Sequence, residues 1–281
     1  MARDPEKSWR FVGIDLASAP ERTGVAVLTV TGPPGARRAR ATLAGDHFIA
    51  DDDGLVALVG EHDVVGLDAP LGWPDNFVAA VSSHHHFEPW PLEPSVTPRE
   101  TLRLRRTDLF VRSLGLGSTP LSVSSDLIGV VAMRAASLQS AWALGGPDEP
   151  RDGSGRLVET YPAVALRRWG LIEPRGVRYK GGPKELRGAQ RETRREMLTR
   201  MGAKSGQWLD VDDGLAEAAL NSDHLFDALI CTLVALAAKG GVTSPPPTKA
   251  DRESARREGW IHVPVGRFED LSVAVESVAI D

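Results

Sequence analysis

The stretch "FVGIDLASAPERTGVAVLTV", residues 11–30, decides the fold, because a turn containing Pro20 joins two apolar, β-branched runs, 11–16 and 24–30. Such runs around a turn former predict a β-hairpin. The first strand ends in a bare carboxylate, Asp15. An unpaired charge in a buried sheet costs on the order of several kcal/mol. We therefore expect Asp15 to have a metal ion, a cation or hydrogen-bond donors beside it.

The rest of the chain alternates strand and helix patterns, which predicts the α/β class. Expected strands follow near 41–48, 63–70 and 156–162, with a short helix within 51–62. Further helices are expected at about 99–114, 127–144, 163–169, 185–201 and 222–239. The Pro-, His- and Trp-rich segment 72–98 suggests a surface insertion, 145–155 a polar loop, 244–259 a linker or exposed loop, and 260–265 a short edge strand. The sum is a five-stranded sheet flanked by helices, with a helical insertion between the fourth and fifth strands.

Length and composition indicate an ordinary globular protein. The 281 residues are 42% hydrophobic, enough for a sizeable core, and we expect one domain over 1–281, with an insertion at about 72–155 and an extension at about 242–281. The N-terminus is charged and the longest apolar run, near 225–238, is too short to cross a bilayer. A cytoplasmic protein without membrane contact is expected. The single cysteine, Cys231, fits core packing, so any metal must be held by oxygen or histidine.

The charge is unevenly placed. The chain carries a formal net charge of −5, yet residues 165–204 contain twelve Lys or Arg and four Glu. A second cluster, residues 99–112, has five Arg and two acids. Each cluster is either a solvated helix face or a surface that follows phosphates.

Four acids stand among apolar neighbours that predict burial: Asp15, Asp68, Glu159 and Asp227. If the first and fourth strands are parallel neighbours, their ends place Asp15 and Asp68 about 5 Å apart. A helix packed beside them would add Asp227. Like charges this close raise one another's pKa unless a hard cation lies between them, as in oxygen-ligated Mg²⁺ or Mn²⁺ sites. This is the expected partner of Asp15.

The last long helix adds a histidine to this group. His224 and Asp227 are three residues apart, so both can face one site. The HxxD spacing resembles the last motif of the RuvC-like branch of the RNase H superfamily, and "GIDLA" resembles that superfamily's first motif. Together with "GLDAPLG", "RLVETYPA", "DHLFDALICTLVALAA" and "EGWIHVP", these segments, over about residues 11–265, look like domain-of-unknown-function family 429, whose members are predicted nucleases of RNase H-like fold.

The resemblance implies an RNase H-like sheet and a metal-dependent nuclease. Asp15, Asp68 and Asp227 would be metal ligands, with Glu159 a further one, and His224 would be a ligand or would position the attacking water. Mg²⁺ or Mn²⁺ would be the cofactor and DNA or RNA the substrate; RuvC-like relatives also suggest a homodimer. Phosphates flanking the cleaved bond would contact basic residues of the two clusters, namely Arg105, Arg106, Lys180 and Lys184.

Two other functions fit the same sequence. An RNase H-like fold can serve as a non-catalytic module that binds nucleic acid or protein, since basic stretches need no catalysis. An actin-like ATPase or kinase shares the strand-one aspartate, although the sequence has one Asp-bearing hairpin and no second glycine-rich motif. Stabilisation by Mn²⁺ would favour the nuclease, and stabilisation by nucleotide the ATPase. The run His84-His85-His86 is read as a solvated loop.

Overall fold

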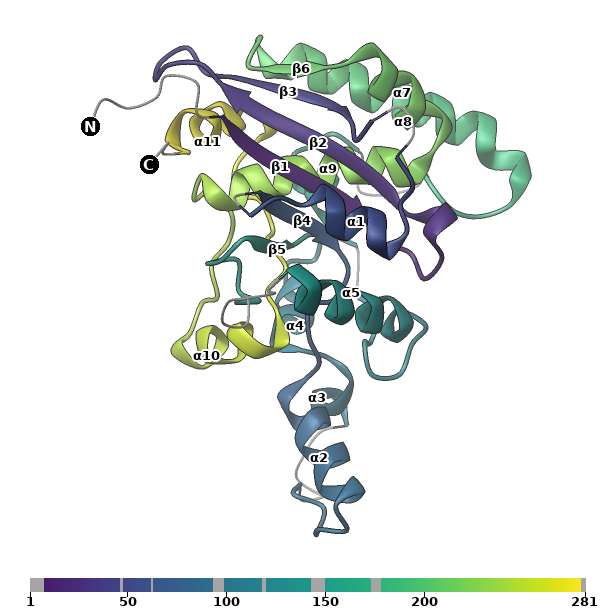
Figure 1. Ribbon diagram of the computed structural model, residues 1–281, viewed down its shortest axis with the longest axis vertical. Helices are drawn as coiled ribbons and strands as arrows, with labels where there is room; N and C mark the ends of the chain where they lie inside the picture. The colour runs from purple at the N-terminus through teal and green to yellow at the C-terminus, as the bar shows by residue number, and fades with distance from the viewer. Residues whose placement is uncertain are drawn as a thin grey trace.

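A computed structural model describes residues 8–45, 48–61, 63–92, 99–117, 120–142, 150–172 and 178–278. Its centre is a six-stranded mixed sheet in the order β5-β4-β1-β2-β3-β6 (Figure 1). The strands are β1 (Trp9–Asp15), β2 (Gly24–Thr31), β3 (Arg38–Leu43), β4 (Val64–Asp68), β5 (Leu157–Glu159) and β6 (Leu209–Val211). β1, β2 and β3 pair antiparallel, β4 runs parallel to β1 and β5, and β6 runs parallel to β3. The expected α/β class and the hairpin at 11–30 are confirmed.

The sheet differs from the expected five strands at its edges. β6 adds a sixth strand beside β3, and at three residues it is too short to show an alternating pattern in the sequence. The segment 260–265 forms isolated bridges, Ile261 with Glu159 and Pro264 with Thr243, and no continuous strand. The prediction of an edge strand there was wrong, because only single residues of this segment reach a partner.

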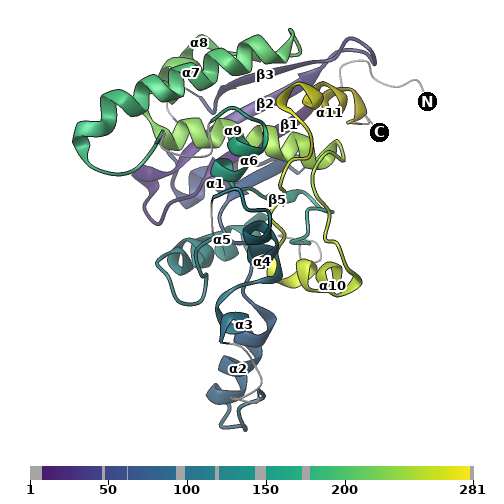
Figure 2. The ribbon, with the colours of Figure 1, turned by 180° about the vertical axis from the view of Figure 1, so that it is seen from behind.

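Helices cover both faces of the sheet. One face carries α1 (Asp52–Leu58) and α5 (Ile128–Trp142). The other face, turned to the viewer in Figure 2, carries α6 (Pro162–Arg168), α7 (Arg187–Ser205), α8 (Asp213–Asn221), α9 (Asp223–Lys239) and α11 (Leu271–Ser277). Short 3-10 turns are η1 (Pro20–Arg22), η2 (Lys184–Leu186) and η3 (Phe268–Asp270). α8 and α11 were not predicted from the sequence.

Between β4 and β5 the chain forms α2 (Asp75–His85), α3 (Glu100–Arg103), α4 (Arg106–Ser113) and α5. α2 and α3 project from the body of the molecule (Figures 1 and 2). The expected helix 99–114 is broken at Leu104, whose backbone is extended. His84 and His85 are exposed in the last turn of α2, where a loop was predicted. Part of the predicted loop 145–155 lies outside the described residues.

The segment 244–259 is not a plain linker, because it contains the helix α10 (Lys249–Glu258). Thr248 caps this helix by accepting a hydrogen bond from the Asp251 N–H, and the Asp251 carboxylate accepts one from the Thr248 N–H. This reciprocal capping box starts a helix whose residues are mostly charged. Residues 246–248 before it contain two prolines, which led to the wrong prediction.

α9 lies directly on the backbone of the sheet. A Cβ atom at Gly13 in β1 would lie 2.1 Å from the Ala228 carbonyl oxygen, and one at Gly66 in β4 would lie 2.3 Å from the Cys231 carbonyl oxygen. Both distances are below any normal contact, so only glycine permits this approach. Cys231 is buried within α9, as expected. The close contact fixes the height of α9 above the ends of β1 and β4.

The structure contains no candidate for a membrane-spanning helix in its described parts: none there combines the necessary length with the necessary apolar character.

Candidate metal centre

Three carboxylates meet where β1 and β4 end under α9. Asp15 and Asp68 are register partners on these parallel strands, so both side chains leave the sheet at the same edge and face α9. Asp227 lies in the first half of α9 and is fully buried, whereas Asp15 and Asp68 are half-buried. One oxygen of each carboxylate lies within 4.8 Å of the others. We call these three residues the carboxylate cluster.

Lys180 contacts the cluster directly. Its Nζ lies 2.5 Å from Asp227 Oδ2, and the Tyr179 hydroxyl donates a 2.9 Å hydrogen bond to Asp227 Oδ1. Both residues belong to the connection between α6 and α7. With all three carboxylates ionised, their charge exceeds that of the Lys180 ammonium by two, and a protonated His224 beside Asp15 would offset one of these charges. The cluster therefore stays negative and attracts a cation.

Burial and repulsion hold protons on the cluster. Burial raises the pKa of Asp68 well above its ordinary value; Lys180 opposes this, while Asp15 and Asp227 add to it. Burial likewise raises the pKa of Asp227 to about 6, against the lowering effect of Lys180. A cation in the cluster would relieve this repulsion and displace the proton that the raised pKa holds on Asp68.

His224 is tied to the cluster through Asp15. Its Nδ1 lies 2.6 Å from Asp15 Oδ2, and this hydrogen bond, with the opposite charge of Asp15, raises the pKa of His224 against the effect of partial burial. His224 stands in the first turn of α9, one turn before Asp227, as the sequence spacing predicted. The histidine therefore lies at the mouth of the cluster and not within it.

The donor set fits a hard divalent cation. Carboxylate oxygens are the ligands that Mg²⁺ and Mn²⁺ prefer. The cysteine nearby, Cys231, stays a neutral thiol, because burial raises its pKa well above the usual range. The repulsion among the carboxylates is a second sign, because Asp15 and Asp227 both raise the pKa of Asp68 and a cation placed between them would relieve that repulsion. Asp15, Asp68 and Asp227 are the residues that would hold it.

Glu159 lies away from the cluster, although its strand is the one predicted. Its side chain forms an ion pair with Arg105, at 2.7 and 2.8 Å, and accepts a bond from the Leu71 N–H. Successive side chains along a strand point to opposite faces of the sheet, which explains this. Glu159 pairs with Leu67, so Thr160 is the residue level with Asp68. The Thr160 hydroxyl donates a hydrogen bond to Cys231 on α9. Glu159 points to the opposite face of the sheet and cannot reach the same ion.

Arg105 is likewise not where a phosphate contact would be. It is 2% exposed and bonds Asp108 and Glu159, with its NH1 also donating to the Glu258 carbonyl. These buried ions form a structural network that joins α4, β5 and α10. The prediction that Arg105 contacts substrate did not foresee this burial, because an arginine-rich helix pattern does not show which of its arginines points into the protein.

The remaining predicted phosphate contacts separate into two places. Arg106 pairs with Asp251 of α10, so it belongs to the surface where α4 meets α10. Lys180 contacts the cluster through Asp227 and is 37% exposed. Lys184 is exposed at the start of η2. Residues 173–177 of the basic stretch lie outside the described residues.

Tyr179 was missed from the sequence. It precedes Lys180 in "VRYKGG" and is buried, although the surrounding stretch is basic and glycine-rich. A single aromatic residue beside a lysine in such a stretch was the signal that could have indicated a buried segment. Its hydroxyl fixes Asp227 from the side opposite Lys180.

Comparison with known proteins gives one match. A family model described as a protein of unknown function (DUF429) matches residues 13–252, which include all three members of the carboxylate cluster and His224. No curated protein and no solved structure matches the chain.

Proposed function

The chain belongs to the DUF429 family, and we propose that it is a divalent-metal-dependent nuclease that hydrolyses phosphodiester bonds at the carboxylate cluster. The observation that carries the proposal is the meeting of Asp15, Asp68 and Asp227, whose carboxylate oxygens lie within 4.8 Å of one another. The fold proposed with it is RNase H-like. The order of β1, β2, β3, α1, β4, β5 and α9 supports that assignment.

When bound, Mg²⁺ or Mn²⁺ would lower the pKa of a water molecule and stabilise the leaving oxygen of the phosphodiester. Asp15 and Asp68 bind from the sheet and Asp227 from the helix, so the ligands are carried by rigid elements. Asp15 also orients His224 through Nδ1. The other ring nitrogen is then the atom that can take or give a proton to water or to the leaving group.

The position of the site agrees with this chemistry. The cluster lies at the carboxyl ends of two parallel strands, where α/β sheets place their ligands. Asp15 and Asp68 are partly exposed, so a phosphate can approach them, while buried Asp227 closes the inner side. A non-catalytic binding module would not need three carboxylates that repel one another.

Cleavage of a labelled panel of single strands, duplexes, hybrids and four-way junctions tests the proposal, in Mg²⁺ and in Mn²⁺. Wild type is compared with Asp68→Asn and Asp227→Asn, and with Glu253→Gln, which changes an exposed acid of α10. We expect cleavage by wild type and by Glu253→Gln, and a loss of at least about 100-fold in the two cluster variants. A wild-type protein that binds Mn²⁺ but cleaves none of the panel would contradict nuclease activity on these substrates.

A further inference from the structure

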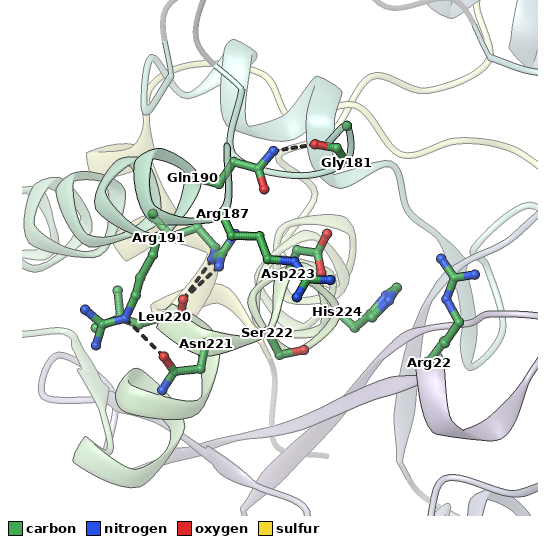
Figure 3. A pocket seen from close by; sticks show the side chains of 13 residues that line it. Arg22, Gly181, Arg187, Gln190, Arg191, Leu220, Asn221, Ser222, Asp223 and His224 are labelled. Atoms are coloured by element: carbon green, nitrogen blue, oxygen red, sulfur yellow. Dashed lines mark hydrogen bonds between the residues drawn. The ribbon is translucent and has the colours of Figure 1, made fainter. Parts of the chain in front are cut away.

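A pocket of about 750 Å³ lies beside the carboxylate cluster. Figure 3 shows that it is walled by α7 on one side and by the start of α9 and the end of the β1–β2 turn on the other. Its lining includes Arg22, Arg187, Arg191, Arg194, Asp223 and His224. We call it the basic pocket. A volume of this size is typical of a site for one small-molecule unit.

The lining is strongly cationic. Four of its side chains are arginines and one, Asp223, is an acid. Arg191 is partly compensated, since it bonds Asn221 and the Glu217 carboxylate. Arg22 and Arg187 are exposed, and within the described residues neither forms an ion pair with a carboxylate. Guanidinium groups without an ion-pair partner on two opposite walls suit an oxyanion, whose several oxygens can each accept hydrogen bonds.

Arg194 gives the pocket a fixed charge. It is 5% exposed, and its guanidinium donates to the Tyr179 carbonyl and, at 2.7 and 3.3 Å, to the Leu220 carbonyl. The described residues give it these carbonyl partners and no ion pair. Asp223 and Asp227 act on this guanidinium from beyond ion-pair distance. Its direct partners are neutral carbonyls, so Arg194 keeps a positive charge beside the basic pocket that favours a bound anion.

The pocket and the cluster share their wall. His224 lines the pocket and bonds Asp15. Gly181 and Gly182, which follow Lys180, also line it, and both have positive φ angles, +70° and +87°. Gln190 ties this turn to α7 by donating to the Gly181 carbonyl. The basic pocket therefore adjoins the carboxylate cluster on two sides, through His224, which bonds Asp15, and through Gly181, which follows Lys180.

We propose that the basic pocket binds a phosphate of a polynucleotide strand adjacent to the phosphodiester held at the carboxylate cluster. The ligand chemistry is a phosphoryl group, bound by Arg22 and Arg187 from opposite walls and attracted by the fixed charge of Arg194. The start of α9 adds the positive end of its helix dipole, against which Asp223 is the opposing charge. The inference rests on the proposed function for the location of the cleaved bond, while binding itself requires neither metal nor chemistry.

The test is equilibrium binding of a fluorescent single-stranded oligonucleotide in EDTA, so that cleavage plays no part. The double variant Arg22→Gln/Arg187→Gln is compared with Arg252→Gln/Arg256→Gln, which removes the same charge from α10. We expect the pocket variant to bind about 25- to 100-fold more weakly at 0.1 M salt, and its slope of log Kd against log salt to fall by about two. The α10 variant should bind like wild type.

Competitors separate the possible sources of the phosphoryl group. Inorganic phosphate and a 5′-mononucleotide should displace the oligonucleotide from wild type only at much higher concentration than an unlabelled oligonucleotide. Equal affinities of the pocket and α10 variants would overturn the inference. Mononucleotide binding that depends on Arg22 and Arg187, with no binding of oligonucleotides by wild type, would overturn the polynucleotide ligand. Binding that depends on the arginines, with no cleavage in the panel above, would support the pocket and contradict the nuclease.

Discussion

Lys180 Nζ contacts Asp227 Oδ2, so a protein ammonium occupies one side of a cluster whose three carboxylates lie within 4.8 Å of one another. Asp227 would also be a ligand for a divalent cation in the proposed site. Lysine and metal therefore compete for Asp227. Lys180 is followed by an irregular turn, in which Gly181 and Gly182 both have positive φ angles.

The competition predicts a tighter metal site when the lysine charge is removed. Lys180→Met should raise Mn²⁺ affinity by about tenfold, equivalent to about 1.4 kcal/mol, because one positive charge no longer opposes the ion. The same variant should lower the melting temperature of the metal-free protein, since Asp227 loses its ion pair. Calorimetric titration measures the affinity, with Lys184→Met as the control from the same segment. Weaker Mn²⁺ binding by Lys180→Met would show that the lysine supports the metal and does not compete with it.

Metal binding should strengthen as pH rises. The pKa of Asp227 is raised to about 6 and that of Asp68 is raised too, both chiefly by burial, so these groups hold protons that a cation must displace. Mn²⁺ affinity should therefore increase from pH 5 to pH 7.5. For the metal-free protein the sign is opposite: raised carboxyl pKa values make the unfolding free energy decrease as pH rises from about 4 through 6. An affinity that is constant over this range would contradict the protonated cluster.

The close approach of α9 depends on glycine. Gly13→Ala should destabilise the protein by about 3 kcal/mol or more, because the new methyl group would overlap the Ala228 carbonyl and push α9 off the sheet. Gly202→Ala is the control: it lies within α7 with open space around its Cβ and should stabilise the protein by about 0.5–1 kcal/mol. Urea denaturation measures both. A Gly13→Ala protein as stable as wild type would mean that α9 does not rest on β1 in this way.

The buried ion network is structural in this account. Arg105→Met should cost about 3–5 kcal/mol of unfolding free energy, because it leaves Glu159 and Asp108 buried without their cation. Mn²⁺ affinity should not change. Arg106→Met, which removes a half-exposed partner of Asp251, should cost less than about 1 kcal/mol. Unchanged stability in Arg105→Met together with weaker oligonucleotide binding would restore the substrate-contact role that the sequence suggested.

Much of the site was accessible from the sequence because each cluster residue ends a recognisable pattern. Asp15 and Asp68 follow apolar strand runs, and the spacing of His224 and Asp227 places both on one helix. The sequence did not show which side chains point to the face of the sheet that carries the cluster. Glu159 ends β5 and Thr160 follows it directly, and the sequence does not reveal which of them is level with Asp68. The register of β4 and β5 decides it, since a shift by one residue turns a side chain to the other face.

The fold was less predictable at its margins. β6 has three residues and α10 is mostly charged, so neither shows a periodic apolar pattern. Lys180 and Tyr179 lie in a basic, glycine-rich stretch that looks solvated. Their burial follows from the contact of this stretch with α9, a long-range relation. Such contacts depend on the packing of distant segments, which local sequence patterns do not describe.

The most direct test of the central claim is calorimetric titration with Mn²⁺ at pH 7.5 of wild type, Asp68→Asn and the control Glu253→Gln. Asp68→Asn removes one charge from a crowded cluster, so the metal-free variant should melt at a higher temperature than wild type. Wild type and Glu253→Gln are predicted to bind Mn²⁺ saturably, and Asp68→Asn to bind at least about 30-fold more weakly. Equal Mn²⁺ affinity in wild type and Asp68→Asn, or no binding by wild type, would contradict a metal centre at Asp15, Asp68 and Asp227.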